Sequence, residues 1–151
     1  MSETSDHLEK GFEYVDELTY ADIAFRAYGK DLSEMFANAA LATSATMVSL
    51  DTVDQKEERK IELTSKDLDD LLFSFLEDIV ALKDSDSILF SEFAVTVKKE
   101  NETYTLVAIC KGDTIDENKQ ELENDVKAVT YHEFKTEDTG QGWMCQVILD
   151  V

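Results

Sequence analysis

Positive charge is scarce in this sequence. The 151 residues include 14 lysines and arginines against 34 aspartates and glutamates, which gives a formal net charge of −20 at pH 7. Such a chain repels a polyanion, whereas nucleic-acid binding requires basic groups that neutralise phosphates. We therefore expect no strong direct RNA binding by this chain alone. The acidity instead favours cations, a basic protein partner or a salt-rich cytoplasm, and most of these carboxylates are expected to be solvated surface.

Long apolar runs are also missing. A membrane-spanning helix needs about 18 consecutive apolar residues, and no segment approaches that length. The first six residues lack the basic start of a signal peptide. The sequence therefore predicts a cytoplasmic protein with no membrane segment. Its length suits a single core, and we expect one domain over residues 11–151 after a mobile leader at residues 1–10.

Cysteine and histidine are too few for several kinds of site. Cys110 and Cys145 lie in strand-like segments without the close spacing of a zinc or redox motif, so both are predicted to be small core residues. A nucleophilic triad would need Ser or Cys near His, and the only histidines are His7, in the expected leader, and His132. Covalent catalysis by this chain is therefore poorly motivated.

Two segments have the period of amphipathic helices. Asp31 and Glu34 form an Asp-x-x-Glu capping box at the start of the first. Thr64 or Ser65 is the expected cap of the second. The apolar positions at helical spacing are Leu32, Met35, Phe36, Ala39, Ala40, Met47 and Leu50 in the first helix, and Leu68, Leu71, Leu72, Phe75, Leu76, Ile79 and Leu82 in the second. Both stripes are predicted to face the core.

The other segments have the alternating pattern of strands. Strand-like stretches precede and follow a polar elbow at residues 19–22, a short strand is expected at 61–64, and a hairpin is expected around residues 99–102. Residues 113–124 form a polar connection with weak helical character, and two further strands cover 126–134 and 142–151. Two helices among mostly antiparallel strands predict an α+β domain.

The last strand ends in acidic groups. Its alternation places Trp143 and Asp150 on opposite faces, and the Asp150 side chain is one residue from the carboxylate of Val151. Carboxylate oxygens are hard donors that suit calcium or magnesium. A lone acid in this position is, however, better explained as ordinary polar surface.

Two polar residues near the preceding strand are candidates for a site. Lys127 and His132 have opposite parity, so a regular strand would direct them to different faces unless a bulge intervenes. Taken alone, Lys127 is better explained as an exposed lysine with a packed stem, and His132 as a structural histidine.

The chain resembles the archease family, small cofactor proteins of RNA ligation. The likeness follows family order over nearly the whole chain and rests on these segments: Thr19-Tyr20-Ala21-Asp22, Ala27-Tyr28-Gly29, Asn38-Ala39-Ala40-Leu41-Ala42, Leu89-Phe90-Ser91-Glu92-Phe93, Val126-Lys127-Ala128-Val129-Thr130-Tyr131-His132 and Val147-Ile148-Leu149-Asp150. One departure is that Thr19 stands where the family usually has His.

The resemblance implies roles for particular residues. The elbow Asp and the Asp near the C-terminus are associated with a metal site in archeases, which by position are Asp22 and Asp150. Together with Val151 they would hold a divalent cation, with calcium expected and magnesium as the alternative. The family Lys associated with function corresponds to Lys127, and it and His132 are the expected contacts to a partner or nucleotide.

The function implied by the resemblance is activation of an RtcB-type RNA ligase in tRNA splicing. The chain would promote guanylylation of the ligase's active-site histidine from GTP and allow multiple turnover, without being an enzyme itself. Two alternatives stay open. One is a metal-dependent hydrolase that uses Asp22 and Asp150 around magnesium. The other is a chaperone-like module that offers an apolar patch to many proteins.

Overall fold

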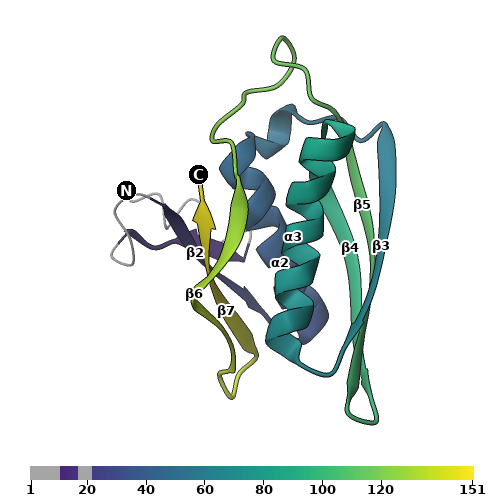
Figure 1. Cartoon of the computed structure of the whole chain (residues 1–151), viewed down its shortest axis with the longest axis vertical. Helices are drawn as coiled ribbons and strands as arrows, with labels where there is room; N and C mark the ends of the chain where they lie inside the picture. The colour runs from purple at the N-terminus through teal and green to yellow at the C-terminus, as the bar shows by residue number, and fades with distance from the viewer. Residues whose placement is uncertain (1–10, 17–21) are drawn as a thin grey trace.

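Two antiparallel sheets enclose a pair of helices in the computed structural model, which describes residues 11–16 and 22–151 (Figure 1). The four-stranded sheet has the order β1-β2-β7-β6 and the three-stranded sheet the order β3-β5-β4. The bounds are β1 Phe12–Tyr14, β2 Ile23–Gly29, α2 Leu32–Met47, the 3-10 turn η2 Leu50–Thr52, β3 Glu57–Ser65, α3 Leu68–Asp86, β4 Ile88–Glu100, β5 Thr103–Thr114, β6 Ala128–Asp138 and β7 Trp143–Asp150.

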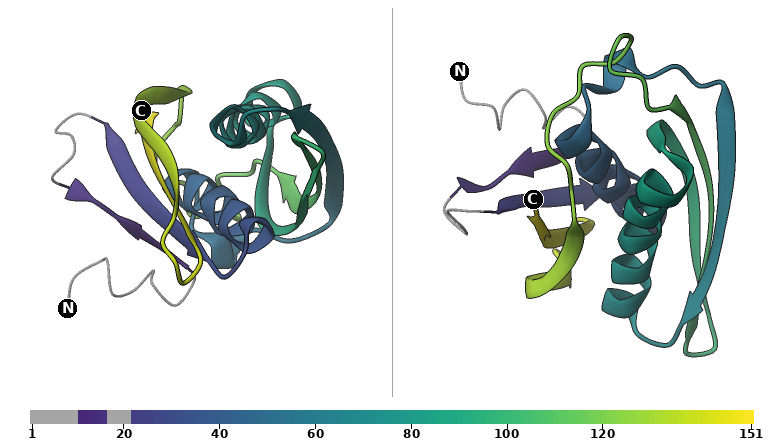
Figure 2. Two further views of the ribbon diagram at one scale, coloured as in Figure 1. Left: turned by 90° about the horizontal axis from the view of Figure 1, so that it is seen from below. Right: turned by 45° about the horizontal axis from the view of Figure 1, so that its top comes forward.

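Each helix packs against both sheets. Helix α2 contacts β2 on one side and β4 on the other, and α3 lies between β6 and β3, as the two views of Figure 2 also indicate. One continuous core therefore joins the two sheets and the helices between them, and both predicted stripes except Leu50 lie in it or pack against it. The α+β fold is confirmed.

In the described part of the chain, neither helix has the length and apolar character that a membrane crossing requires. The expected leader at residues 1–10 falls outside the described residues.

Helix α2 begins where the capping box predicts. The Asp31 carboxylate accepts a hydrogen bond of 2.9 Å from the Glu34 N–H, and Glu34 Oε1 accepts one of 3.0 Å from the Lys30 N–H. The helix ends at Met47, so Leu50 belongs to η2 instead of continuing the stripe. The chain leaves the helix because Val48 is extended and bridges to Leu122.

The predicted cap of α3 is wrong. Asp67 is the N-cap, and its carboxylate accepts a 3.0 Å bond from the Asp70 N–H. Thr64 and Ser65 cannot serve because β3 runs through Ser65. That strand also begins earlier than predicted, at Glu57, since pairing with β5 uses the backbone and tolerates charged side chains on an edge strand.

The weak helix predicted within residues 113–124 does not form. Strand β5 continues to Thr114, and the segment after it pairs with the end of α2. Three backbone bonds of 2.8 to 3.0 Å join Ser49 to Glu121, Glu123 to Met47 and Asn124 to Thr46. These partners satisfy the backbone groups that a helix would otherwise pair internally.

Other local predictions are confirmed. The β4–β5 hairpin turns at Asn101 and Glu102, both with positive φ as a two-residue turn requires.

Cys110 and Cys145 are fully buried in the core. Burial raises the pKa of each thiol to about 12, so both remain protonated and unreactive at neutral pH.

Gly29 ends β2 where the backbone of α2 comes very close. A Cβ at this position would overlap the Met35 nitrogen and the carbonyl carbon of Glu34. Because these are backbone atoms in the first turn of a helix, they cannot move aside cheaply. The close approach explains physically why glycine follows Tyr28.

We expect Gly29→Ala to destabilise the fold by about 3 kcal/mol, the upper part of the usual range for overpacking. Urea denaturation followed by circular dichroism measures the change. Gly140→Asn is the comparison variant and should lose less stability, because no atom lies within 4 Å of a Cβ there and Asn adopts the positive φ of 84° at lower cost than most residues. Equal stability of Gly29→Ala and the parent would contradict the close approach of α2 to β2.

Candidate functional site

Asp22 and Asp150 lie at the same end of the four-stranded sheet. Strand β7 is central and pairs with β2, and the last pair of their ladder is Ile23 with Leu149. Asp22 and Asp150 are the next residues on each strand, so the antiparallel register places them across from each other. Both are half-buried, and Ile148 and Leu149 before Asp150 are buried in full.

Lys127 joins this end of the sheet from a third segment. Its backbone N–H donates a 2.8 Å hydrogen bond to the Asp150 carbonyl, and β6 then begins with Ala128 paired to Asp150. The Lys127 side chain is exposed and Val151 is half-buried. Asp22 and Lys127 therefore lie on either side of Asp150 at one end of β7, with Lys127 next in the register, across from Val151. We name Asp22, Lys127 and Asp150 the acidic end of the sheet.

His132 lies elsewhere on the strand. The β6–β7 register shifts between Thr130 and Lys135, so four residues of β6 stand opposite Val147 alone. His132 is exposed within this bulge, five residues from Lys127 and hence roughly 16 Å along an extended strand. A bulge does exist on β6, and His132 lies within it instead of at the end of the strand where Ala128 pairs with Asp150.

Gln146 holds the bulge and was not foreseen as a site residue. Its buried amide accepts a 3.0 Å bond from Arg26 Nε and donates one of 2.9 Å to the Glu133 carbonyl. Glu133 has a positive φ of 54°, a strained conformation that this bond helps to fix. No pattern in the sequence identifies this role, since alternation places Gln146 only on the same face of the strand as Asp150.

The donor chemistry of the acidic end fits a hard divalent cation only in part. Asp22 and Asp150 offer carboxylate oxygens, the preferred ligands of calcium and magnesium. Calcium takes six to eight oxygens, so two carboxylates leave most of the shell to water, backbone oxygen or a partner. Among residues 11–16 and 22–151, no cluster of three or more His, Cys, Asp or Glu could hold a metal. Residues 19–21 of the elbow lie outside the described residues.

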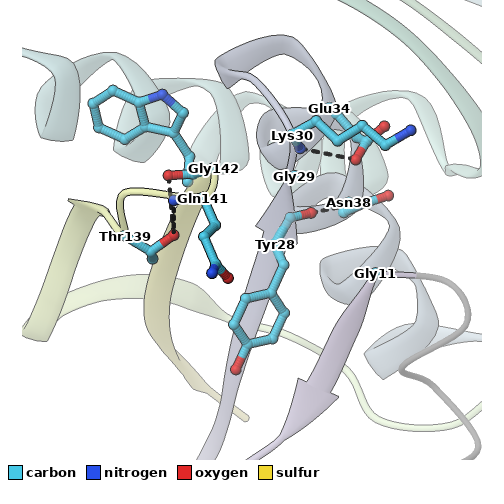
Figure 3. Close-up of a pocket in the computed structure, with 10 residues that line it drawn as sticks. Gly11, Tyr28, Gly29, Lys30, Glu34, Asn38, Thr139, Gln141 and Gly142 are labelled. Carbon is cyan, nitrogen blue, oxygen red and sulfur yellow. Dashed lines mark hydrogen bonds between the residues drawn. The ribbon is translucent and has the colours of Figure 1, made fainter.

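A cavity of about 320 Å³ lies at the opposite end of β2 and β7, beside Gly29 and Gly142 (Figure 3). Two of the polar groups that line it are bonded to the strand ends. Asn38 donates a 2.7 Å bond to the Tyr28 carbonyl, and the hydroxyl of Thr139 donates one of 3.2 Å to the Gly142 carbonyl. These bonds fasten the strand ends to α2 and to the β6–β7 turn, so we assign this cavity a structural role.

Comparison with known proteins identifies relatives over nearly the whole chain. Residues 12–151 match the model of the Archease protein family (MTH1598/TM1083). Protein archease of Pyrococcus abyssi is 37% identical over 132 residues, covering 87% of this chain and 93% of the relative. Protein archease of Methanothermobacter thermautotrophicus is 39% identical over 142 residues, covering 94% and 99%.

Solved structures agree with the fold. The solution structure of protein 1598 of Methanobacterium thermoautotrophicum has a TM-score of 0.82 at 39% identity, covering 94% of this chain and 99% of that one. The crystal structure of an archease, described as a possible chaperone, from Thermotoga maritima has a TM-score of 0.60 at 22% identity, covering 88% and 93%, and supports the fold alone. By sequence and by fold, this chain belongs to the archease family.

Proposed function

We propose that this chain activates an RtcB-type RNA ligase in tRNA splicing. It would promote guanylylation of the ligase's active-site histidine from GTP and support multiple turnover, while the ligase performs the covalent chemistry. The observation that carries the proposal is the meeting of Asp22, Asp150 and Lys127 at one end of the sheet in a chain of this family. We place the activity in the cytoplasm.

The composition of the acidic end supports a helper role. Two carboxylates and one amine supply no activated nucleophile, whereas they can hold a cation and contact a phosphate. In this proposal Asp22 and Asp150, with oxygens of Val151, bind a divalent cation, calcium or magnesium. A bound cation would offset the repulsion between the two acids and polarise a phosphate oxygen.

Lys127 supplies the positive charge beside the two acids. Because its ammonium is exposed, it can reach a phosphate of GTP or an acidic group of the ligase without a conformational change. His132, exposed in the β6 bulge, would contact the ligase at a second point on the same strand. The large negative charge of the chain favours a basic surface on that partner and disfavours direct RNA binding.

The general chaperone hypothesis has less support. The sequence left it open, and the Thermotoga maritima relative is described as a possible chaperone. In the described residues, the large apolar side chains that are exposed are Val107, Leu122 and Tyr131, which lie on β5, the segment before β6 and β6 itself. A binding surface for many unfolded chains needs a contiguous apolar patch, which three separate side chains do not supply.

Divalent cations should raise the melting temperature, because a ligand that binds only the folded state stabilises it by mass action, by about 2.7 kcal/mol at 100 times Kd. Asp150→Asn should lower the rise produced by calcium or magnesium and leave the metal-free melting temperature largely unchanged. Glu58→Gln on β3 is the matched control and should respond like the parent. Unchanged responses in both Asp22→Asn and Asp150→Asn would exclude this site.

The purified protein alone should neither join RNA ends nor hydrolyse GTP at an appreciable rate, because it offers no activated nucleophile at the acidic end. Phosphate release and gel-based ligation assays, each with and without an RtcB-type ligase, measure both activities. Steady GTP hydrolysis without the ligase, lost in Asp22→Asn, would favour the metal-dependent hydrolase instead.

Lys127→Met should lose most of the stimulation of multiple-turnover ligation while keeping its fold. Methionine preserves much of the stem volume and removes the charge, so the change in stability should be about 1 kcal/mol or less, a shift of a few degrees. The control is Lys66→Met, an exposed lysine in the turn before α3. Stimulation by Lys127→Met equal to that of the parent would show that the charge has no role.

A further inference from the structure

Lys83, in the last turn of α3, is buried although it is charged. Its side chain is only 8% exposed, while its two acidic partners Asp84 and Asp125 are 62% and 74% exposed. The ammonium is 2.7 Å from Asp84 Oδ1 and donates bonds of 2.6 Å to Asp125 Oδ1 and 2.8 Å to the Val126 carbonyl. An ammonium has three N–H donors, and three acceptors surround this one.

These partners keep Lys83 charged in its buried position. Burial by itself lowers the pKa of Lys83, but the hydrogen bonds to Asp125 and Asp84 outweigh it and raise the pKa. A lysine near the end of a helix that served only the helix dipole could extend into solvent. Lys83 instead points toward the segment that leads into β6.

The Val126–Lys127 peptide group is held on both sides. Its carbonyl oxygen, from Val126, accepts the bond from Lys83, and its N–H, from Lys127, donates to the Asp150 carbonyl. Because a peptide group is planar, fixing both polar atoms fixes the orientation of the whole unit. The Cα of Lys127 is part of that unit, so α3 and β7 together determine where the Lys127 side chain starts.

The anchor matters because Lys127 follows a long irregular segment. Residues 115–127 contain no helix or strand, and backbone bonds to the end of α2 hold them only as far as Asn124. Lys83 supplies the next attachment, at Asp125 and Val126. Without it, Asp125 and Val126 would lose their polar contacts with α3, and only the apolar packing of Val126 in the core would remain.

We propose that Lys83 is a positioning residue, which clamps the Val126–Lys127 peptide against the end of β7 and so sets the place of Lys127 beside Asp150. The inference rests on the proposed function only for its activity readout, because the clamp itself can be measured in the isolated protein. Lys83 acts through Lys127 and contacts neither the ligase nor its substrates.

The direct test is hydrogen exchange of the Lys127 amide by NMR in the isolated protein. Lys83→Met should increase exchange of this amide roughly tenfold, the factor expected for loss of a hydrogen bond to a charged group. The increase should be confined to residues 125–128, with amides of β5 such as Ala108 unchanged. A lysine that only stabilises the fold would instead speed exchange across the whole core.

Matched variants separate the clamp from ordinary ion pairing. Asp84→Asn removes a partner that does not touch the 125–127 segment, and Lys111→Met breaks an exposed pair with Glu92 at 3.7 Å, so both should leave Lys127 exchange unchanged. Lys83→Arg retains the charge and donors and should restore part of the protection. Asp125→Asn should speed the same amide by a smaller factor, and it serves as the test if Lys83→Met does not fold.

Stimulation of the RNA ligase gives the second readout. Lys83→Met should lower the stimulation of the ligase when this protein is present at saturating concentration. The same change should cause no further loss in a chain that already carries Lys127→Met, because both changes act through the Lys127 side chain. Unchanged Lys127 exchange in both Lys83→Met and Asp125→Asn would overturn the clamp. If Lys127→Met itself retains stimulation, the proposed function fails at Lys127, and the exchange data still decide whether Lys83 holds the peptide.

Discussion

The pairing of β7 with strands on both sides is the constraint on which the arrangement depends. Ile23 of β2 and Ala128 of β6 pair with Leu149 and Asp150 of β7, so the start of two strands is fixed against the end of a third. A shift of one residue in either ladder would move every side chain of that strand to the other face. Burial of Cys145, Val147 and Leu149 in the core opposes such a shift, and the acidic end follows from the register it preserves.

Burial and charge are separated along the same strand. The interior of β7 lies within the sheet, where both faces are covered, and Gln146 satisfies its amide through Arg26 and the Glu133 carbonyl. Asp150, at the end, is half-buried. Asp22 and Asp150 therefore stand at the rim of the sheet instead of within its buried interior, which is where the proposed cation site requires them.

Polar contacts as well as apolar packing join helix α3 to β6 and to the segment before it. Lys83 connects α3 to the segment before β6, and the Asp69 carboxylate accepts a hydrogen bond from the Thr136 hydroxyl farther along the same strand. Phe73 of α3 stacks on Tyr131 with ring centroids 3.8 Å apart. Helix α3 therefore supports β6 at both ends and at the bulge, although the hydrogen-bonding partner of β6 is β7.

The sequence by itself determined the family, both helices, the β4–β5 hairpin, the alternation of β7 and the candidates Asp22, Lys127 and Asp150, because these depend on local period, turn residues or recognisable segments. The tertiary structure decided the rest. It extended β3 through Ser65 and so made Asp67 the cap of α3. It also formed the four-residue bulge that contains His132, and it buried Lys83 beside Asp125. Each of these outcomes depends on contacts between residues far apart in the chain, and local periodicity carries no information about such contacts.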